Sequence, residues 1–304
     1  MPSVFQPLPG GITPEFLTIG HVTRDILADG AFALGGTVTF AALSAYCLGL
    51  ASAVVTCADD ELTRQLPVNL PSIGLAGHVC EESTTFVNIY SDEGFRTQYL
   101  RARASDLSID DIPSDWQSAP IVLFGPLTQE FTPELVRGFR REPGRILAAT
   151  PQGWLRRWDA DGRVWPTPWT AAEEVLPMLD VLILSHDDLL PFADGNRAEA
   201  DAILARWSMH VPLLVATDGR HGATLFRRGV TERFPAYEAK EIDPTGAGDV
   251  FAAAFLVHFY RHGNPRAAVD FANCVASLSI EHLGATGIPS MEDVAKRIGV
   301  GDAL

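Results

Sequence analysis

The sequence predicts an α/β protein with one large, mostly parallel β-sheet covered by helices on both faces, a three-layer sandwich. Three observations predict it. Short and fully apolar segments recur along the chain, helical patterns separate them, and most end at a glycine, proline or threonine. Strands that are buried on both faces of a parallel sheet have such continuous apolar runs, with helices as the crossovers between them. Ligands of these sheets bind at the carboxyl ends of the strands, where we expect the functional residues.

The first half of the chain begins with a strand predicted at residues 16–19, which ends at Gly20. Residues 39–48 form an apolar helical pattern that ends at Gly49, and residues 53–56 predict the next strand. Later strands are predicted from apolar runs of the same kind, at residues 121–124, 146–149, 181–184 and 213–216.

A β-hairpin is predicted at residues 84–100, where two β-rich runs flank the acidic turn Asp92-Glu93-Gly94. Together with residues 26–34 it would form a small β lid beside the main sheet. No linker, repeat or low-complexity segment divides the chain, so residues 1–304 are expected to form a single domain.

The composition narrows the classes of partner. The net charge is −15 and the isoelectric point about 4.9, so the surface repels nucleic acid, although a small nucleotide needs only a few local donors. The uncharged stretch between Asp29 and Asp59 is interrupted by glycine and hydroxyl residues, so no membrane span is expected. No signal peptide is recognisable. The four cysteines lack paired spacing, so we expect them to be reduced thiols in a cytoplasmic protein. The protein is expected to be a monomer or a homodimer.

The segment Asp243-Pro244-Thr245-Gly246-Ala247-Gly248-Asp249 precedes a long apolar helix. The first amides of a helix lack partners within the helix and carry the positive end of its dipole, and the two glycines let the backbone approach an anion closely. A phosphate site and a simple helix cap, with Asp249 as the capping carboxylate, are both consistent with this pattern.

This segment resembles the D-T-x-G-A-G-D signature of the ribokinase-like (PfkB) carbohydrate kinase family, and the resemblance extends over nearly the whole chain. It implies the ribokinase-like fold and phosphoryl transfer from ATP to a hydroxyl group. Asp249 would take the proton of the acceptor hydroxyl, and the amides of Gly246, Ala247 and Gly248 would form an anion hole.

The resemblance also implies an acceptor-binding site in the first half of the chain. Asp25, after the first strand, would hold hydroxyls of a sugar or polyol, and Gly35 and Gly36 would close against the substrate. A solvated loop carboxylate is the alternative for Asp25. Gln152 would either bind a ring hydroxyl or cap a turn.

One difference from many family members concerns the acceptor. Phe40 occupies the place where they carry an asparagine that contacts the sugar. With Gly20-His21-Val22 and Gln152-Gly153-Trp154, the sequence is similar to the myo-inositol kinase branch of the family. A nucleoside kinase is the runner-up, because Phe40 and Trp154 could stack on a base. From a different class of protein, a non-catalytic sugar or nucleotide sensor is the alternative, although a sensor needs no general base.

The binding site for the phosphoryl donor is predicted from weaker patterns. Thr217, Gly219 and Gly222 resemble the family's nucleotide-contact loop, and Asn273 a residue that borders the adenine, although a glycine-rich turn between strands is common for structural reasons alone. Asp188, where the family has a glutamate, would be the carboxylate on the Mg²⁺ side, and His186 is expected to be a surface or packing residue.

Asp243 resembles the monovalent-cation ligand of potassium-activated members, with loop bracing as its alternative. The cofactors implied are ATP, Mg²⁺ and K⁺. No GxxxxGK[ST] phosphate loop is present and no GxGxxG follows the first strand, so Walker-type ATPases and Rossmann dehydrogenases are not favoured.

Overall fold

The computed structural model describes residues 3–90 and 96–299. Ten strands form the main sheet in the order β1-β6-β5-β2-β9-β10-β13-β14-β15-β16. Their bounds are β1 Ser3–Gln6, β2 Phe16–Ile19, β5 Ser52–Ala58, β6 Gly74–Val79, β9 Ile121–Phe124, β10 Ile146–Ala149, β13 Val181–Ser185, β14 Leu213–Thr217, β15 Ala223–Arg227 and β16 Val230–Phe234. The seven strands from β6 to β14 in this order are parallel to one another, and the outer strands β1, β15 and β16 pair antiparallel with their neighbours.

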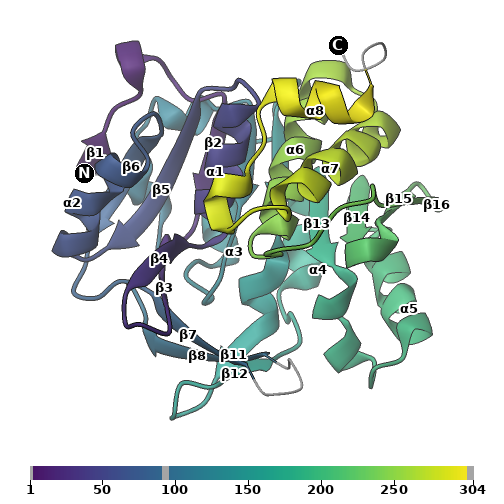
Figure 1. The fold of residues 1–304 in the computed structure, drawn as a ribbon, viewed down its shortest axis with the longest axis horizontal. Coiled ribbons are helices and arrows are strands. Elements are labelled where there is room, and N and C mark those ends of the chain that lie inside the picture. Colours follow the sequence, from purple (N-terminus) through teal and green to yellow (C-terminus); the bar gives the residue numbers. More distant parts are fainter. Residues whose placement is uncertain (1–2, 91–95, 300–304) are drawn as a thin grey trace.

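Helices cover both faces of the sheet, which gives the predicted three layers (Figure 1). One face packs against α1 (Thr37–Cys47), α2 (Asp60–Asn69), α6 (Ala247–His262), α7 (Pro265–Ser279) and α8 (Met291–Ile298). The other face packs against α3 (Pro133–Gly138), α4 (Ala172–Val175) and α5 (Arg197–Trp207). Successive strand residues point to opposite faces, so each apolar strand contributes to both cores. In β9, for example, Leu123 joins the α6 side and Phe124 the α3 side.

A four-stranded sheet in the order β4-β3-β7-β8 lies beside the main sheet, at the bottom of Figure 1. Its strands are β3 (Thr23–Ile26), β4 (Phe32–Gly35), β7 (Thr85–Tyr90) and β8 (Arg96–Ala102). We call it the lid sheet. A further pair, β11 (Arg156–Trp158) and β12 (Val164–Pro166), joins it through a bridge between Tyr99 and Arg163. The predicted turn Asp92-Glu93-Gly94 lies outside the described residues.

The strands predicted from apolar runs are confirmed, three of them to the residue: 16–19, 121–124 and 146–149. Strands β1, β6, β15 and β16 were not predicted: β1 and β16 are the edges of the sheet, and β6 and β15 are next to them. All four mix polar residues or glycine with apolar ones, and an edge strand is covered by helices less completely than a central one.

The expectation of four reduced thiols is wrong for two of them, because Cys57 and Cys80 form a disulfide. The reason is the strand register. Parallel pairing of β5 with β6 places Cys57 opposite His78, two residues before Cys80. A separation of 23 residues along the chain gave no sign of this proximity. Cys47 and Cys274 are free.

No helix among residues 3–90 and 96–299 is both long and apolar enough to cross a membrane.

Gly153 marks a close approach between two strand ends. It lies in a 3-10 turn, Pro151–Leu155, that follows β10, and a Cβ atom there would lie 2.3 Å from the amide nitrogen of Leu127 and 2.4 Å from the carbonyl carbon of Pro126. Backbone cannot rotate away as a side chain can. The absence of a side chain at Gly153 therefore lets the segments that follow β9 and β10 touch.

We predict that Gly153→Ala lowers the free energy of unfolding by about 2 kcal/mol or more, as other overpacking substitutions do. Chemical denaturation measures the change. Gly138→Ala is the control, because its Cβ would meet only the movable side chain of Ile109, at 3.0 Å. If both variants were as stable as the parent, the close contact between the two strand ends would be refuted.

Candidate active site

The residues singled out in the sequence gather at one edge of the main sheet, as expected. Parallel pairing keeps the carboxyl ends of the strands level: Ile19 pairs with Phe124, Phe124 with Ala149, and Ser185 with Thr217. The segments that continue from these ends carry Asp25, Gln152, Asp188, Gly219 and Gly222.

Helix α6 supplies the Asp249 carboxylate. The helix begins after Gly246, whose φ of +76° is the left-handed conformation that favours glycine. A Cβ atom at Gly246 would also lie 2.4 Å from the ring of Phe40, so this turn packs directly on α1. Asp249 follows in the first turn of α6 and is hydrogen-bonded to the side chain of Thr37, at the start of α1. The first turns of α1 and α6 therefore hold the carboxylate between them.

Burial raises the pKa of Asp249 to about 6. The hydrogen bond from Thr37 and the positive charge of Arg156 lower it, and the negative charge of Asp188 raises it further. Arg156 and Asp188 are thus close enough to Asp249 to act on its charge. A carboxyl group with a pKa near 6 is a stronger base than an ordinary aspartate and is still ionised at neutral pH.

Two of the three amides predicted to bind an anion have no partner in the described part of the chain. The amide of Ala247 donates to the carbonyl of Pro244 over 3.1 Å, whereas those of Gly246 and Gly248 donate to no protein group there. A Cβ at Gly248 would meet nothing within 4 Å, so this side of the turn faces open space. An anion can approach the start of α6 there.

Asp25 lies on strand β3 of the lid sheet, and not on a loop as in the alternative of a solvated loop carboxylate. Its partner strand β4 brings Gly35 against it: a Cβ at Gly35 would lie 2.2 Å from Oδ2 of Asp25. The hydroxyl of Thr23 donates to the other carboxylate oxygen over 3.1 Å. Any larger residue than glycine at position 35 would displace the Asp25 carboxylate.

Gly36 lets the chain turn from the lid sheet into α1. Its φ is +93°, and a Cβ there would lie 2.5 Å from the carbonyl oxygen of His21. The next residue is Thr37, which contacts Asp249. Residues 35–37 therefore join the two predicted key residues, with Gly35 against Asp25 and Thr37 against Asp249.

The expectation that Phe40 and Trp154 are available for stacking on a base is wrong. Phe40 is 4% exposed and packs on Gly246. Trp154 is 8% exposed, stacks on Trp169 with 4.8 Å between ring centroids, and points its indole N–H at the carbonyl of Phe131. Both rings belong to the hydrophobic cores. The neighbouring Gln152 is half-buried, and its side-chain amide makes no hydrogen bond to any described residue.

On the predicted donor side, Thr217 ends β14, and its hydroxyl donates to the carbonyl of Leu184 at 3.4 Å. The turn that follows is closed by the Asp218 amide donating to Gly222, at 2.8 Å. Gly219 has a φ of +49° and faces open space.

Gly222 and Asn273 approach the same segment, residues 234–236, from two sides. A Cβ at Gly222 would lie 2.0 Å from the Phe234 carbonyl oxygen, and the Asn273 amide donates to the Pro235 carbonyl at 3.0 Å. Both residues therefore position this segment next to the turn that holds Gly219.

The acidic residues predicted to bind cations also have structural partners. Asp188 accepts a hydrogen bond from the Ser185 amide, 3.1 Å away, and so caps the turn after β13. Asp243 accepts from the amides of Thr245 (3.0 Å) and Gly284 (2.9 Å), which is the loop-bracing role. His186 is buried and pairs with Asp201 at 3.0 Å, as expected of a packing residue.

Nowhere in residues 3–90 and 96–299 do three His, Cys, Asp or Glu side chains converge as a metal site. One carboxylate beside a phosphate site still suits Mg²⁺, which keeps several waters and takes substrate phosphates as ligands.

Sequence reasoning missed Thr37, Arg156 and Glu130. Arg156 lies four residues after Gln152, and only the fold shows that it acts on Asp249. Glu130 is fully buried, yet its carboxylate accepts hydrogen bonds from the amides of His21, Leu127 and Thr128 at 2.7–3.1 Å. Its neighbours in the chain are Gln129 and Phe131, and no pattern in this segment marked it.

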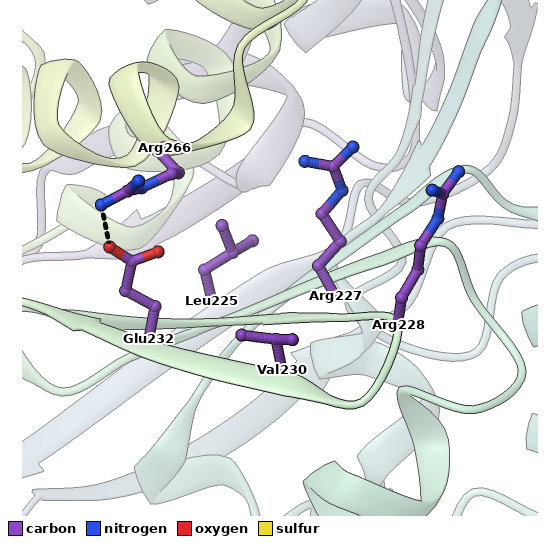
Figure 2. Close-up of a pocket in the computed structure, with 6 residues that line it drawn as sticks. All are labelled: Leu225, Arg227, Arg228, Val230, Glu232 and Arg266. Carbon is purple, nitrogen blue, oxygen red and sulfur yellow. Dashed lines mark hydrogen bonds and ion pairs between the residues drawn. The ribbon is translucent and has the colours of Figure 1, made fainter.

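A hollow of about 380 Å³ lies elsewhere, on the β15–β16 hairpin beside the start of α7 (Figure 2). Arg266 pairs with Glu232 across it at 2.5 Å, and Arg227 and Arg228 extend side by side (Figure 2). None of the residues predicted for the active site lines this hollow.

Comparisons with known proteins agree with this picture. Residues 160–292 match the model of the pfkB family carbohydrate kinases. Fructokinase-2 of Zea mays is 29% identical over 162 residues, which are 49% of this chain and 48% of that protein. The chain thus spans about half the length of the curated relatives it matches first.

Two solved structures are similar over almost the entire chain. A pyrophosphate-dependent kinase in the ribokinase family, complexed with a pyrophosphate analog and myo-inositol, has a TM-score of 0.76 at 23% identity, covering 93% of this chain and 99% of that one. Ribokinase of Arabidopsis thaliana, complexed with ribose and ATP, has a TM-score of 0.71 at 18% identity, covering 95% and 100%.

The matched family segment contains Asp188, Asp249 and the donor-side residues, and the fold of the whole chain is that of ribokinase-family structures. Residues 160–292 therefore match the pfkB family carbohydrate kinases, and the chain has the fold of ribokinase-family structures.

Proposed function

We propose that this protein is a kinase that transfers a phosphoryl group to a hydroxyl of a sugar or cyclitol, with Asp249 as the general base. One observation carries the proposal. A carboxylate with a pKa of about 6 lies in the first turn of α6, where the amides of Gly246 and Gly248 donate to no protein group among the described residues, and Arg156 and Asp188 are close to it. Phosphoryl transfer needs this combination of a positioned base and local positive charge.

Each residue has a defined part in the proposed reaction. Asp25 accepts hydrogen bonds from hydroxyls of the acceptor and orients it. Asp249 accepts the proton of the reacting hydroxyl as the hydroxyl oxygen attacks the terminal phosphorus of the donor. The bond from that phosphorus to the bridging oxygen breaks, and the remainder of the donor leaves, as ADP when the donor is ATP. The amides of Gly246 and Gly248, together with Arg156, stabilise the negative charge that develops on the phosphoryl oxygens. Asp188 would hold Mg²⁺ through its waters, and a bound Mg²⁺ neutralises charge on the donor phosphates.

For the acceptor we favour a cyclitol such as myo-inositol over a pentose or hexose. Phe40 is not the asparagine of many sugar kinases, and Gly20-His21-Val22 and Gln152-Gly153 resemble the inositol kinase branch. The free amide of Gln152 supports a polar ring contact. Burial of Phe40 and Trp154 removes the two rings on which the nucleoside kinase alternative relied.

For the donor we favour ATP, which the resemblance to the family implies. Pyrophosphate is a second candidate, because a similar structure is of a pyrophosphate-dependent kinase. Two observations favour it: Asn273, expected beside the adenine, is hydrogen-bonded to Pro235, and Arg156 adds a positive charge near Asp249. Three further properties remain predictions: that Asp243 is a ligand of K⁺, that the protein is cytoplasmic, and that it is a monomer or a homodimer.

We predict that Asp249→Asn lowers kcat by about 10²–10⁴, because asparagine keeps the size of the side chain but cannot accept the proton. The same variant should be more stable than the parent at pH 7.5, by about 1–3 kcal/mol. The folded-state pKa is raised, so the folded protein loses stability as the pH rises from about 4 to 6, and asparagine avoids this cost.

Steady-state kinetics and chemical denaturation test the two effects. Asp187, which is exposed and adjacent to Asp188, is the control position. Asp187→Asn should change neither quantity. A kcat for Asp249→Asn within about threefold of the parent would mean that Asp249 is not the base.

The pH profile gives a second prediction. Since Asp249 must be ionised in the free enzyme, kcat/KM should fall about tenfold per pH unit below a midpoint near pH 6. Rate measurements from pH 4.5 to 8 locate the midpoint. A midpoint near pH 4, the value of an ordinary aspartate, would contradict a buried base.

A panel of acceptors tests the substrate. With ATP and Mg²⁺, we expect kcat/KM for myo-inositol to exceed that for ribose, fructose and adenosine at least tenfold. The same panel with pyrophosphate in place of ATP decides the donor. A value for ribose, fructose or adenosine tenfold above that for myo-inositol would refute the cyclitol and leave the kinase assignment intact. Binding without turnover for every acceptor and both donors would favour the sensor.

A further inference from the structure

The lid hairpin, strands β7 and β8, is attached to the main domain at two roots: Ser83–Thr84 before β7 and Arg103–Ser105 after β8. His21, between β2 and β3, contacts both roots and is fully buried. Its ring nitrogen Nδ1 lies 2.7 Å from the Thr84 hydroxyl, and Nε2 lies 2.9 Å from the Ser105 carbonyl oxygen.

The partners of the two ring nitrogens differ. A carbonyl oxygen only accepts, so Nε2 carries a hydrogen and donates to Ser105. Nδ1 lies beside two hydroxyls, those of Thr84 at 2.7 Å and Thr128 at 3.4 Å, and a hydroxyl can donate to an unprotonated Nδ1. These contacts suit a neutral ring, as does burial, which lowers the pKa of His21 and outweighs the raising effect of Glu130.

Glu130 fixes the backbone of His21 from the other side. It accepts the amide of His21 at 3.1 Å together with the amides of Leu127 and Thr128 from the segment after β9. The histidine backbone is thus anchored to the main sheet while its ring is bonded to the lid roots. His21 therefore links the main sheet to the roots of the lid hairpin.

The same roots also set the position of Asp25. The Arg24 amide donates to the Thr84 carbonyl at 2.9 Å, and in the parallel pairing of β3 with β7 Asp25 lies opposite Phe86. Nearby, Asp59 accepts hydrogen bonds from both Arg24 and Ser83. A movement of the hairpin root at Thr84 therefore moves the strand that carries Asp25.

We propose that the hydrogen bond between Thr84 and His21 couples the lid hairpin to the acceptor site, so that His21 and Thr84 are positioning residues for acceptor binding. The inference rests on the proposed function for the role of Asp25. The two residues touch no reacting atom and act by keeping Asp25 in place over Gly35.

The test replaces Thr84 by valine, which has the same shape without the hydroxyl. We expect KM for the acceptor to rise about tenfold, because two buried hydrogen bonds are lost, the one to Nδ1 of His21 and the one from the Ala104 amide. Only the longer contact with the Thr128 hydroxyl, at 3.4 Å, then remains at Nδ1. KM for the phosphoryl donor and kcat at saturating acceptor should stay within about twofold. Thr84→Ser restores the hydroxyl and should restore KM.

Thr18→Val is the matched control. Thr18 is as fully buried as Thr84, and its hydroxyl donates to the Ala53 carbonyl at 3.2 Å inside the main sheet, away from the lid roots. If the hydroxyl of Thr84 only contributed to stability, both valine variants would lose stability, and their effects on the acceptor KM would be the same. An unchanged acceptor KM in Thr84→Val, or an equal rise in Thr18→Val, overturns the proposal.

A readout that does not need activity separates this inference from the proposed function. Hydrogen exchange of the backbone amides should become faster in Thr84→Val for β3, β7 and β8 together, and remain at the parental rate there in Thr18→Val. If the protein phosphorylates no acceptor but these strands respond together, the proposed function fails and the coupling stands. If exchange in β3 is unchanged while β7 and β8 become faster, the coupling is refuted even in an active kinase.

Discussion

The level carboxyl ends of the parallel strands are the constraint on which the site depends. Parallel register between β2, β9 and β10, and between β13 and β14, brings segments that are far apart in the chain to one edge of the sheet. Strands buried on both faces cannot shift their register without moving apolar side chains between the two cores. The segments that carry Gln152, Asp188 and Gly219 therefore keep their spacing, because the cores on both faces of the sheet hold the register of the strands.

Close backbone contacts then bring the pieces of the site together. Gly35 makes room for the Asp25 carboxylate, Gly153 lets two strand ends touch, and Gly246 lets the start of α6 lie on Phe40. In each case a methyl group would occupy a position that another atom already holds. The large side chains close to the site, Phe40 and Trp154, are buried in this packing, so mainly polar groups are left to contact a ligand.

Two aspartates near helix starts show how the surroundings decide the role of one residue type. Asp59 caps α2: although burial raises its pKa, hydrogen bonds from Arg24, Leu62 and Ser83 lower it to about 2. At Asp249 burial outweighs the favourable contacts and raises the pKa to about 6. Asp59 stabilises the fold at neutral pH, and its contribution is lost as the pH falls from about 4 to 2. Asp249 costs stability at the same pH, and its raised pKa suits the general base proposed for it.

The sequence by itself determined the layered fold, the positions of the central strands and the segment around Asp249, because these depend on local patterns: apolar runs, glycines and a helix start. It also singled out Asp25 and the glycine pair at residues 35 and 36. Only the tertiary structure decided which residues act on one another. Arg156 and Thr37 affect Asp249, Cys57 pairs with Cys80, and His21 joins the lid roots, through contacts between residues distant in the chain. Such contacts depend on strand register and on how helices pack over the sheet. They determine which side chains are buried and which charges are close together, so no local pattern in the sequence contains this information.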